Sequence, residues 1–131
     1  MSRCRKCEPV PEEVRGVADL LGKRWQLAIL YAAHLGAVRF GEFQESVGGV
    51  SARMLTERLR ELEEAGLMER EVIPTSPPQV EYRLTEQGKK LGPVLEAMQV
   101  YAVEVTVEIE VEVEVDVHVD PAAAEPERRT A

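Results

Sequence analysis

Two cysteines near the start of the chain have the clearest potential for covalent chemistry. Cys4 and Cys7 form a Cys-x-x-Cys pair, and three cations stand beside them, Arg3, Arg5 and Lys6. Nearby cations favour the thiolate, which is the reactive form of cysteine. The pair could respond to an oxidant or an electrophile, or two pairs in a dimer could supply four thiolates to a metal ion. An unreactive basic segment is the third interpretation.

A second set of candidate residues lies in the segment 51–64. On a helix with 100° per residue, Leu55, Leu59 and Leu62 share one stripe, and charged side chains share the opposite stripe. An arginine there can donate two hydrogen bonds to guanine, and a glutamate can accept one from cytosine. The alternative is a solvated helix face on which charged neighbours, such as Arg53 and Glu57, pair with each other. The candidate base contacts are Arg53, Thr56, Glu57 and Arg60.

Capping and breaking residues predict the elements that position this face. Ser51 is a candidate N-cap, and prolines separate the two segments that look like paired strands. Pro93 lies inside the last expected helix and should bend it. Helices are expected over residues 11–21, 23–35, 40–47, 52–65 and 86–101, and strands over 68–73 and 80–85. A mainly α fold with a small β-hairpin in this order is typical of a winged helix-turn-helix, whose recognition helix lies in the major groove of DNA.

Further polar residues around that helix are candidate contacts to the phosphate backbone. Ser51 would stand at a helix N-terminus, where unpaired N–H groups and the helix dipole favour an anion. Arg39 has an alternative partner in Glu42. The hairpin tip, residues 74–79, has no Lys or Arg, so we expect a modest contribution from it. The candidate phosphate contacts are Ser51, Arg24, Arg39, Arg70, Thr75, Ser76, Gln79 and Arg83.

The composition changes after residue 102. Residues 103–120 alternate Val or Ile with a polar residue, and this period of two is typical of a strand. Such an extension could pair with its copy, pack on the body or join a partner's sheet, and a dispensable tail is the other interpretation. The predicted domains are an N-terminal arm (1–10), a winged-helix domain (11–102), a strand-like extension (103–120) and a disordered tail (121–131).

The charge distribution is compatible with DNA binding although the net charge is −8. Residues 104–131 hold nine acidic and two basic residues, so nearly all of the excess lies in the tail. The body is balanced, and a basic face needs only a local sorting of charges.

The sequence offers no sign of membrane insertion or of catalysis. No apolar run is long enough to span a bilayer, and the N-terminus lacks the apolar segment of a secretion signal. We therefore expect a cytoplasmic protein with reduced cysteines. No Ser/His/Asp set, glycine-rich phosphate loop or metalloprotease spacing appears, so we expect neither an enzyme nor a cofactor.

Several ordered motifs together make the chain resemble the HxlR family of bacterial winged-helix transcription regulators, from Cys7 to about Tyr101. The motifs are Asp19-Leu20-Leu21-Gly22-Lys23-Arg24-Trp25, Arg39-Phe40-Gly41-Glu42-Phe43, Ser51-Ala52-Arg53-Met54-Leu55-Thr56, Leu59-Arg60-Glu61-Leu62-Glu63-Glu64-Ala65-Gly66-Leu67, Pro77-Pro78, Val80-Glu81-Tyr82-Arg83-Leu84-Thr85 and Gly88.

The resemblance implies a sequence-specific transcriptional regulator that binds a double-stranded palindromic operator. It also implies a homodimer paired through its first and last helices. The family includes regulators that sense oxidants or electrophiles at the position of Cys7, and Cys4 would then be the resolving thiol. One alternative is a protein-interaction module that uses the acidic extension. Another is a thiol oxidoreductase, although the strand-then-helix setting of such motifs is lacking.

Overall fold

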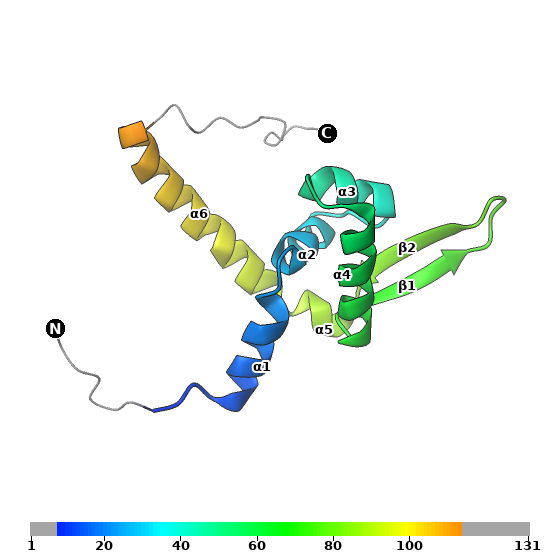
Figure 1. Cartoon of the computed structure of the whole chain (residues 1–131), viewed down its shortest axis with the longest axis horizontal. Helices are drawn as coiled ribbons and strands as arrows, with labels where there is room; N and C mark the ends of the chain where they lie inside the picture. The colour runs from blue at the N-terminus through cyan, green and yellow to red at the C-terminus, as the bar shows by residue number, and fades with distance from the viewer. Residues whose placement is uncertain (1–7, 114–131) are drawn as a thin grey trace.

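The computed structural model describes residues 8–113, which form a small helical body with one β-hairpin (Figure 1). Helices α1 and α6 extend from one side of this body, and the hairpin extends from the opposite side. Within the described range, no helix is long and apolar enough to cross a membrane. The elements are α1 (Glu12–Leu21), α2 (Gln26–His34), α3 (Phe40–Val47), α4 (Ala52–Glu64), β1 (Met68–Ile73), β2 (Gln79–Leu84), α5 (Glu86–Lys89) and α6 (Gly92–Val113).

The first two helices confirm the predicted pattern with one correction. Helix α1 follows Pro11 and carries Glu12 and Glu13 in its first turn, where acids suit the helix dipole. Helix α2 was expected from residue 23, but it begins at Gln26. The reason is Trp25, whose φ of 79° is left-handed and cannot belong to a right-handed helix.

Helices α3 and α4 form the helix-turn-helix pair. The N–H groups of Val38 and Arg39 donate to Oε1 of Glu42, at 2.9 and 3.0 Å, and thereby satisfy groups at the start of α3. These backbone hydrogen bonds lower the pKa of Glu42. Ser51 is the N-cap of α4, as predicted, because its Oγ accepts from the Met54 N–H at 3.0 Å.

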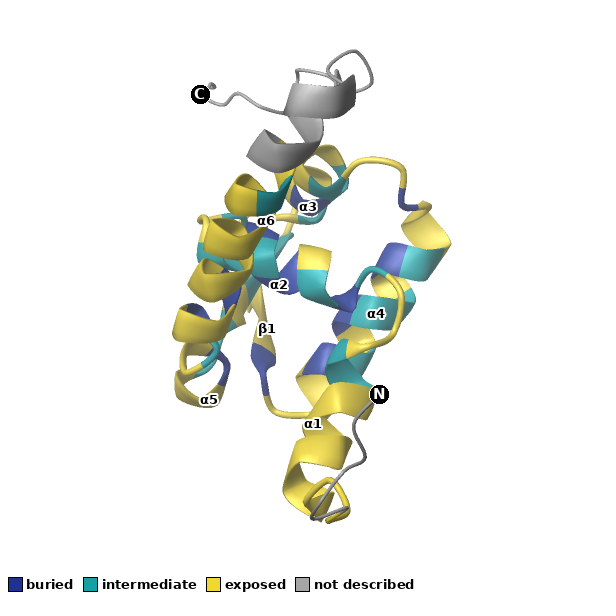
Figure 2. Ribbon diagram, turned by 90° about the vertical axis from the view of Figure 1, so that its left-hand side faces the viewer, coloured by how far each residue is buried: buried dark blue, intermediate teal, exposed yellow. Residues whose placement is uncertain are grey.

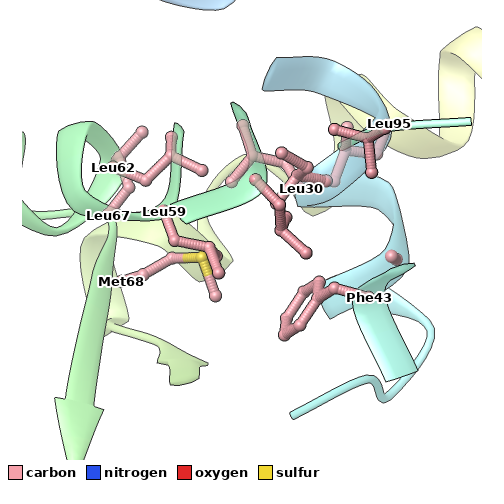
Figure 3. Close-up of a cluster of buried hydrophobic side chains, with 11 residues drawn as sticks. Leu30, Phe43, Leu59, Leu62, Leu67, Met68 and Leu95 are labelled. Carbon is pink, nitrogen blue, oxygen red and sulfur yellow. The ribbon is translucent and has the colours of Figure 1, made fainter. Parts of the chain in front are cut away.

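The core lies between α2, α3, α4, β1 and α6 (Figure 3). The predicted leucine stripe of α4 is confirmed, since Leu55, Leu59 and Leu62 have no exposed surface. They face a cluster that includes Ile29, Leu30, Phe43, Met68 and Leu95. The apolar side of α4 is therefore locked in the body, and its other side is left for solvent or a partner.

The hairpin is antiparallel, with a register that runs from Met68 opposite Leu84 to Ile73 opposite Gln79. Strand β2 lies one residue earlier than predicted. The reason is Thr85, whose Oγ1 accepts from the Gly88 N–H at 3.0 Å and so caps α5. A hydrogen bond of 2.8 Å from the Tyr82 N–H to the Val38 oxygen attaches the hairpin to the segment before α3.

The expected single bent helix over 86–101 is wrong. The chain forms α5, makes a turn at residues 90–91, and then begins α6 at Gly92. Pro93 is the second residue of α6 and stands in its first turn, where a missing N–H breaks no intrahelical hydrogen bond. The proline therefore helps to start a helix and does not bend one.

The strand expected over residues 103–120 is also wrong where the structure describes it, because 103–113 continue α6. A helix that is already formed extends by one hydrogen bond per residue. A strand would need a partner, and the sheet in the described range has only β1 and β2. Residues 114–120 of the extension and the expected tail lie outside the described range.

Candidate nucleic-acid interface

The exposed side of α4 carries the residues expected to contact bases. Arg53, Thr56 and Arg60 are exposed, and Glu57 is half-buried. Among residues 8–106, neither arginine makes an ion pair within 4.0 Å, so the intrahelical pairs considered as the alternative are not formed. Thr56 donates from Oγ1 to the Ala52 oxygen at 2.8 Å, which leaves its lone pairs available. This face therefore presents two unpaired guanidinium groups.

Ser51 lies at the exposed N-terminal end of this helix. Its Oγ accepts the capping hydrogen bond, so the structural role considered for it is present. A hydroxyl also carries one donor, which remains able to bind an anion beside the cap. The two interpretations of Ser51 are therefore compatible.

Arg24 lies in the turn of residues 23–25 that joins α1 to α2. Its guanidinium carbon stands 4.5 Å from the ring centroid of Trp25, a distance that suits a cation–π contact. Its backbone oxygen accepts a hydrogen bond of 2.9 Å from Nε of Arg58, a residue of α4. The tertiary structure thus brings Arg24 beside α4.

Sequence reasoning missed Arg58. Its Nη1 lies 2.9 Å from Oε1 of Glu61, and its side chain is only 16% exposed. The i,i+3 spacing with Glu61 is visible in the sequence. The hydrogen bond to Arg24, 34 residues away, has no local signal.

Two predicted phosphate contacts share one partner, Glu81, in the middle of β2. Nη2 of Arg83 lies 2.6 Å from Oε1 of Glu81, and Nη2 of Arg39 lies 3.8 Å from its Oε2. The proposed alternative for Arg39, an ion pair with Glu42, is replaced by the contact of Glu42 with the Arg39 backbone N–H. Glu81 was missed by sequence reasoning, and its side chain is 13% exposed.

The remaining hairpin residues are spread along its length. Arg70 is exposed on β1, and Gln79 is half-buried at the start of β2. At the tip, Thr75 donates from Oγ1 to the Pro77 oxygen at 2.7 Å, and Ser76 is exposed. The tip projects away from the helices (Figure 1), so Thr75 and Ser76 are not gathered with the two arginines that share a carboxylate.

Cys4 and Cys7 lie outside the described residues, which begin at Glu8. Among the described residues, no group of three His, Cys, Asp or Glu side chains could hold a metal ion. The thiol and metal hypotheses therefore stay predictions.

Comparison with known proteins points to one family. A family model described as an HxlR-like helix-turn-helix matches residues 20–110. The HTH-type transcriptional regulator YvaP of Bacillus subtilis is 42% identical over 86 residues, which are 66% of this chain and 80% of YvaP. YodB of the same organism, also an HTH-type transcriptional regulator, is 45% identical over 84 residues, or 64% of this chain and 75% of YodB.

Solved structures support the same similarity. The reduced form of the redox regulator HypR has a TM-score of 0.69 and 36% identity, and the match covers 76% of this chain and 99% of HypR. The reduced form of YodB has a TM-score of 0.64 and 39% identity, with 72% of this chain and 92% of YodB covered. YodB is also known in diamide-treated and quinone-bound forms, and HypR in an oxidised form.

Proposed function

This chain belongs to the HxlR family of helix-turn-helix transcriptional regulators, and we propose that it is a sequence-specific DNA-binding regulator whose helix α4 enters the major groove. One observation carries the proposal. Helix α4 is capped at Ser51 and buries its leucines, while Arg53 and Arg60 stand on its exposed side without an ion pair among the described residues. A rigid helix with unpaired outward arginines suits the reading of base edges.

The candidate residues then divide into two roles. Arg53, Thr56, Glu57 and Arg60 contact bases, because they lie on the exposed or half-exposed side of α4. Residues around the helix contact phosphates and fix its orientation without reading sequence. The phosphate contacts are Ser51, Arg24, Arg39, Arg70 and Arg83, with smaller contributions from Thr75, Ser76 and Gln79 at or beside the hairpin tip.

The protein acts as a homodimer in this proposal. Helix α1 has no buried residue, and both α1 and α6 are largely exposed in one chain (Figure 2). Val17 of α1 is 51% exposed, and Tyr101 of α6 is 68% exposed. A second copy would cover these apolar side chains, and a twofold dimer would read a palindromic operator with half-sites about one helical turn apart.

The proposed signal is an oxidant or an electrophile that modifies Cys7, with Cys4 as the resolving thiol. Its support is the similarity to YodB, solved with diamide treatment and with quinone, and to the redox regulator HypR. The cations around the two thiols also favour thiolates. Such a regulator would work in the cytoplasm, where its operator lies and where thiols rest in the reduced state.

Selection of bound duplexes from a random DNA pool tests the proposal. The full chain should enrich one palindromic sequence, and its affinity should fall steeply as salt rises, because each neutralised phosphate releases counterions. A second selection after diamide treatment tests the signal, with Cys7→Ser as the variant that should no longer respond. Recovery of no common sequence would refute the DNA-binding proposal. A full diamide response in Cys7→Ser would refute only the sensing part.

A further inference from the structure

The turn of residues 23–25 between α1 and α2 holds an unfavourable conformation. Trp25 has a φ of 79°, which is rare for a bulky aromatic residue. Next to it, Gln26 is fully buried, and its amide atoms find no hydrogen-bonding partner among the described residues. Such local outliers persist only where the surroundings impose them, and they concentrate at functional positions.

The surroundings that impose this turn belong to the recognition helix and the residues before it. The Trp25 ring lies against Gly49, since its Cη2 is 3.7 Å from where a Cβ on Gly49 would stand. Gly49 belongs to the turn that leads into α4. The turn of residues 23–25 therefore contacts the segment that precedes α4 through the Trp25 ring.

A second contact reaches the middle of α4. Arg58 donates from Nε to the Arg24 oxygen at 2.9 Å and from Nη1 to Glu61 Oε1 at 2.9 Å. The same Glu61 oxygen lies 3.4 Å from Nζ of Lys23. On α4, Glu61 thus holds the side chain of Lys23, and Arg58 holds the backbone of Arg24. Arg58 is mostly buried in this arrangement and does not share the exposed face of Arg53.

This turn directly joins α1 to the body. Helix α1 has no fully buried residue, and it leads from the N-terminal arm that carries Cys7. Its last two residues, Leu20 and Leu21, pack partly against the core directly before the turn. A shift of α1 would therefore act on the body at its C-terminal end, where the turn of residues 23–25 follows. Chains of packed side chains and hydrogen bonds are the means by which such a shift reaches a distant site.

We propose that Arg58 is a positioning residue that couples the α1–α2 turn to the recognition helix, so that the orientation of α4 follows the orientation of α1. The inference rests on the proposed DNA-binding function. It goes further by assigning to Arg58 a role in operator discrimination that needs no contact between this side chain and DNA.

Arg58→Met tests the inference, because methionine keeps part of the apolar stem and removes every donor. Binding would be measured by fluorescence anisotropy on the selected duplex and on a scrambled duplex, over a range of salt concentrations. The affinity for the selected duplex should fall about tenfold, as when one base contact is lost, while the affinity for the scrambled duplex is unchanged. The salt dependence should also be unchanged, whereas loss of a phosphate contact would lower its slope by about 1.

Lys90→Met is the matched control, since it removes an exposed cation outside the proposed interface. If Arg58→Met does not fold, Glu61→Gln replaces it as an isosteric change that weakens the same cluster, with Glu63→Gln as its control. Glu61→Gln should also lower the affinity for the selected duplex without changing the affinity for the scrambled duplex. Glu63→Gln should change neither affinity.

The single tryptophan offers a second readout, because Trp25 is the only one in the chain. In the unmodified protein, saturation with the selected duplex should change Trp25 emission more than saturation with the scrambled duplex does, and this difference should be lost in the Arg58 or Glu61 variant. Unchanged discrimination in the variant, or an equal loss of affinity for both duplexes, would overturn the inference. Failure of the unmodified protein to select any duplex would instead refute the DNA-binding function itself.

Discussion

Arg83 donates a hydrogen bond of 2.6 Å from Nη2 to Oε1 of Glu81, a residue in the middle of β2. The other carboxylate oxygen of Glu81 lies 3.8 Å from Nη2 of Arg39. One largely buried carboxylate therefore holds two exposed guanidinium groups on the path from the hairpin to α3. It orients both arginines, and it also neutralises part of the charge that they could offer to a phosphate.

Replacing Glu81 by glutamine should strengthen DNA binding. Glu81→Gln keeps the side-chain shape and releases both arginines from their carboxylate. The affinity at low salt should rise only about three-fold, because an ion pair of an exposed arginine contributes about 0.2–1 kcal/mol. The salt dependence should become steeper, because more positive charge meets phosphate. Anisotropy titrations over several salt concentrations would measure both changes.

Glu71→Gln is the control for that change. Glu71 stands directly opposite Glu81 in the hairpin register and makes no ion pair in the described range. The substitution Glu71→Gln therefore removes the same charge as Glu81→Gln without freeing an arginine. An equal gain from both variants would show that overall charge, and not release of Arg39 and Arg83, controls the affinity.

The double variant Arg53→Ala/Arg60→Ala should fold and lose its operator. Both side chains are exposed, and exposed substitutions change stability by about 0.5 kcal/mol or less. Each arginine contact to a base contributes about 1–3 kcal/mol, so loss of both should lower the affinity by about 30-fold or more. Circular dichroism melts and anisotropy measure the two effects, and Lys89→Ala/Lys90→Ala, which removes two exposed cations of α5 and its end, is the control for lost charge. Undiminished binding by the double variant would contradict the placement of α4 in the major groove.

A charge on the exposed apolar face of α1 should separate the proposed dimer. Val17 is half-exposed in one chain, so Val17→Lys leaves the core intact and places a cation in the interface. Size-exclusion chromatography with light scattering should then report the mass of one chain. Val72→Lys, on the similarly exposed Val72 of the hairpin, should leave the dimer unchanged. A dimer that persists in Val17→Lys would place the interface elsewhere.

Glycine at position 88 is required by close packing. A Cβ there would overlap the backbone oxygen of Leu67 and lie 3.1 Å from Cδ2 of Leu84. Since a backbone oxygen cannot move aside cheaply, Gly88→Ala should lower the free energy of unfolding by about 2 kcal/mol or more. Urea denaturation measures it. Gly41→Ala is the control, because its Cβ would meet nothing within 4 Å, and it should leave stability unchanged or slightly higher.

Glu42 should make the free energy of unfolding fall with pH in the range below the ordinary pKa of a glutamate. Its pKa is lowered by the hydrogen bonds from the Val38 and Arg39 N–H groups, with a smaller effect of the Arg39 charge. A lowered pKa means that the folded state holds fewer protons, so the stabilisation is complete above the ordinary pKa and is lost as pH falls through the lowered one. Glu42→Gln should remove this part of the acid-side decline in unfolding free energy. Glu45→Gln, on the same helix, should retain it, and an identical decline in both variants would exclude Glu42 as the source.

The sequence by itself determined the features that depend on near neighbours. The leucine stripe of α4 follows from a spacing of three and four residues, and the Ser51 cap from a partner three residues away. The hairpin follows from two segments with strand-like residues around a proline-rich tip. Together with the resemblance to the HxlR family, these signals were enough to predict the winged helix-turn-helix and to choose α4 as the candidate recognition helix.

Only the tertiary structure decided which distant residues meet. Arg58 bonds to Arg24, 34 residues away, and Glu81 gathers Arg39 with Arg83, because helices and hairpin pack in one body. The left-handed Trp25 is likewise a product of packing, since its own backbone preference opposes it. Residues 103–113 alternate like a strand, yet they continue α6, because a helix satisfies its own backbone and a strand needs a partner.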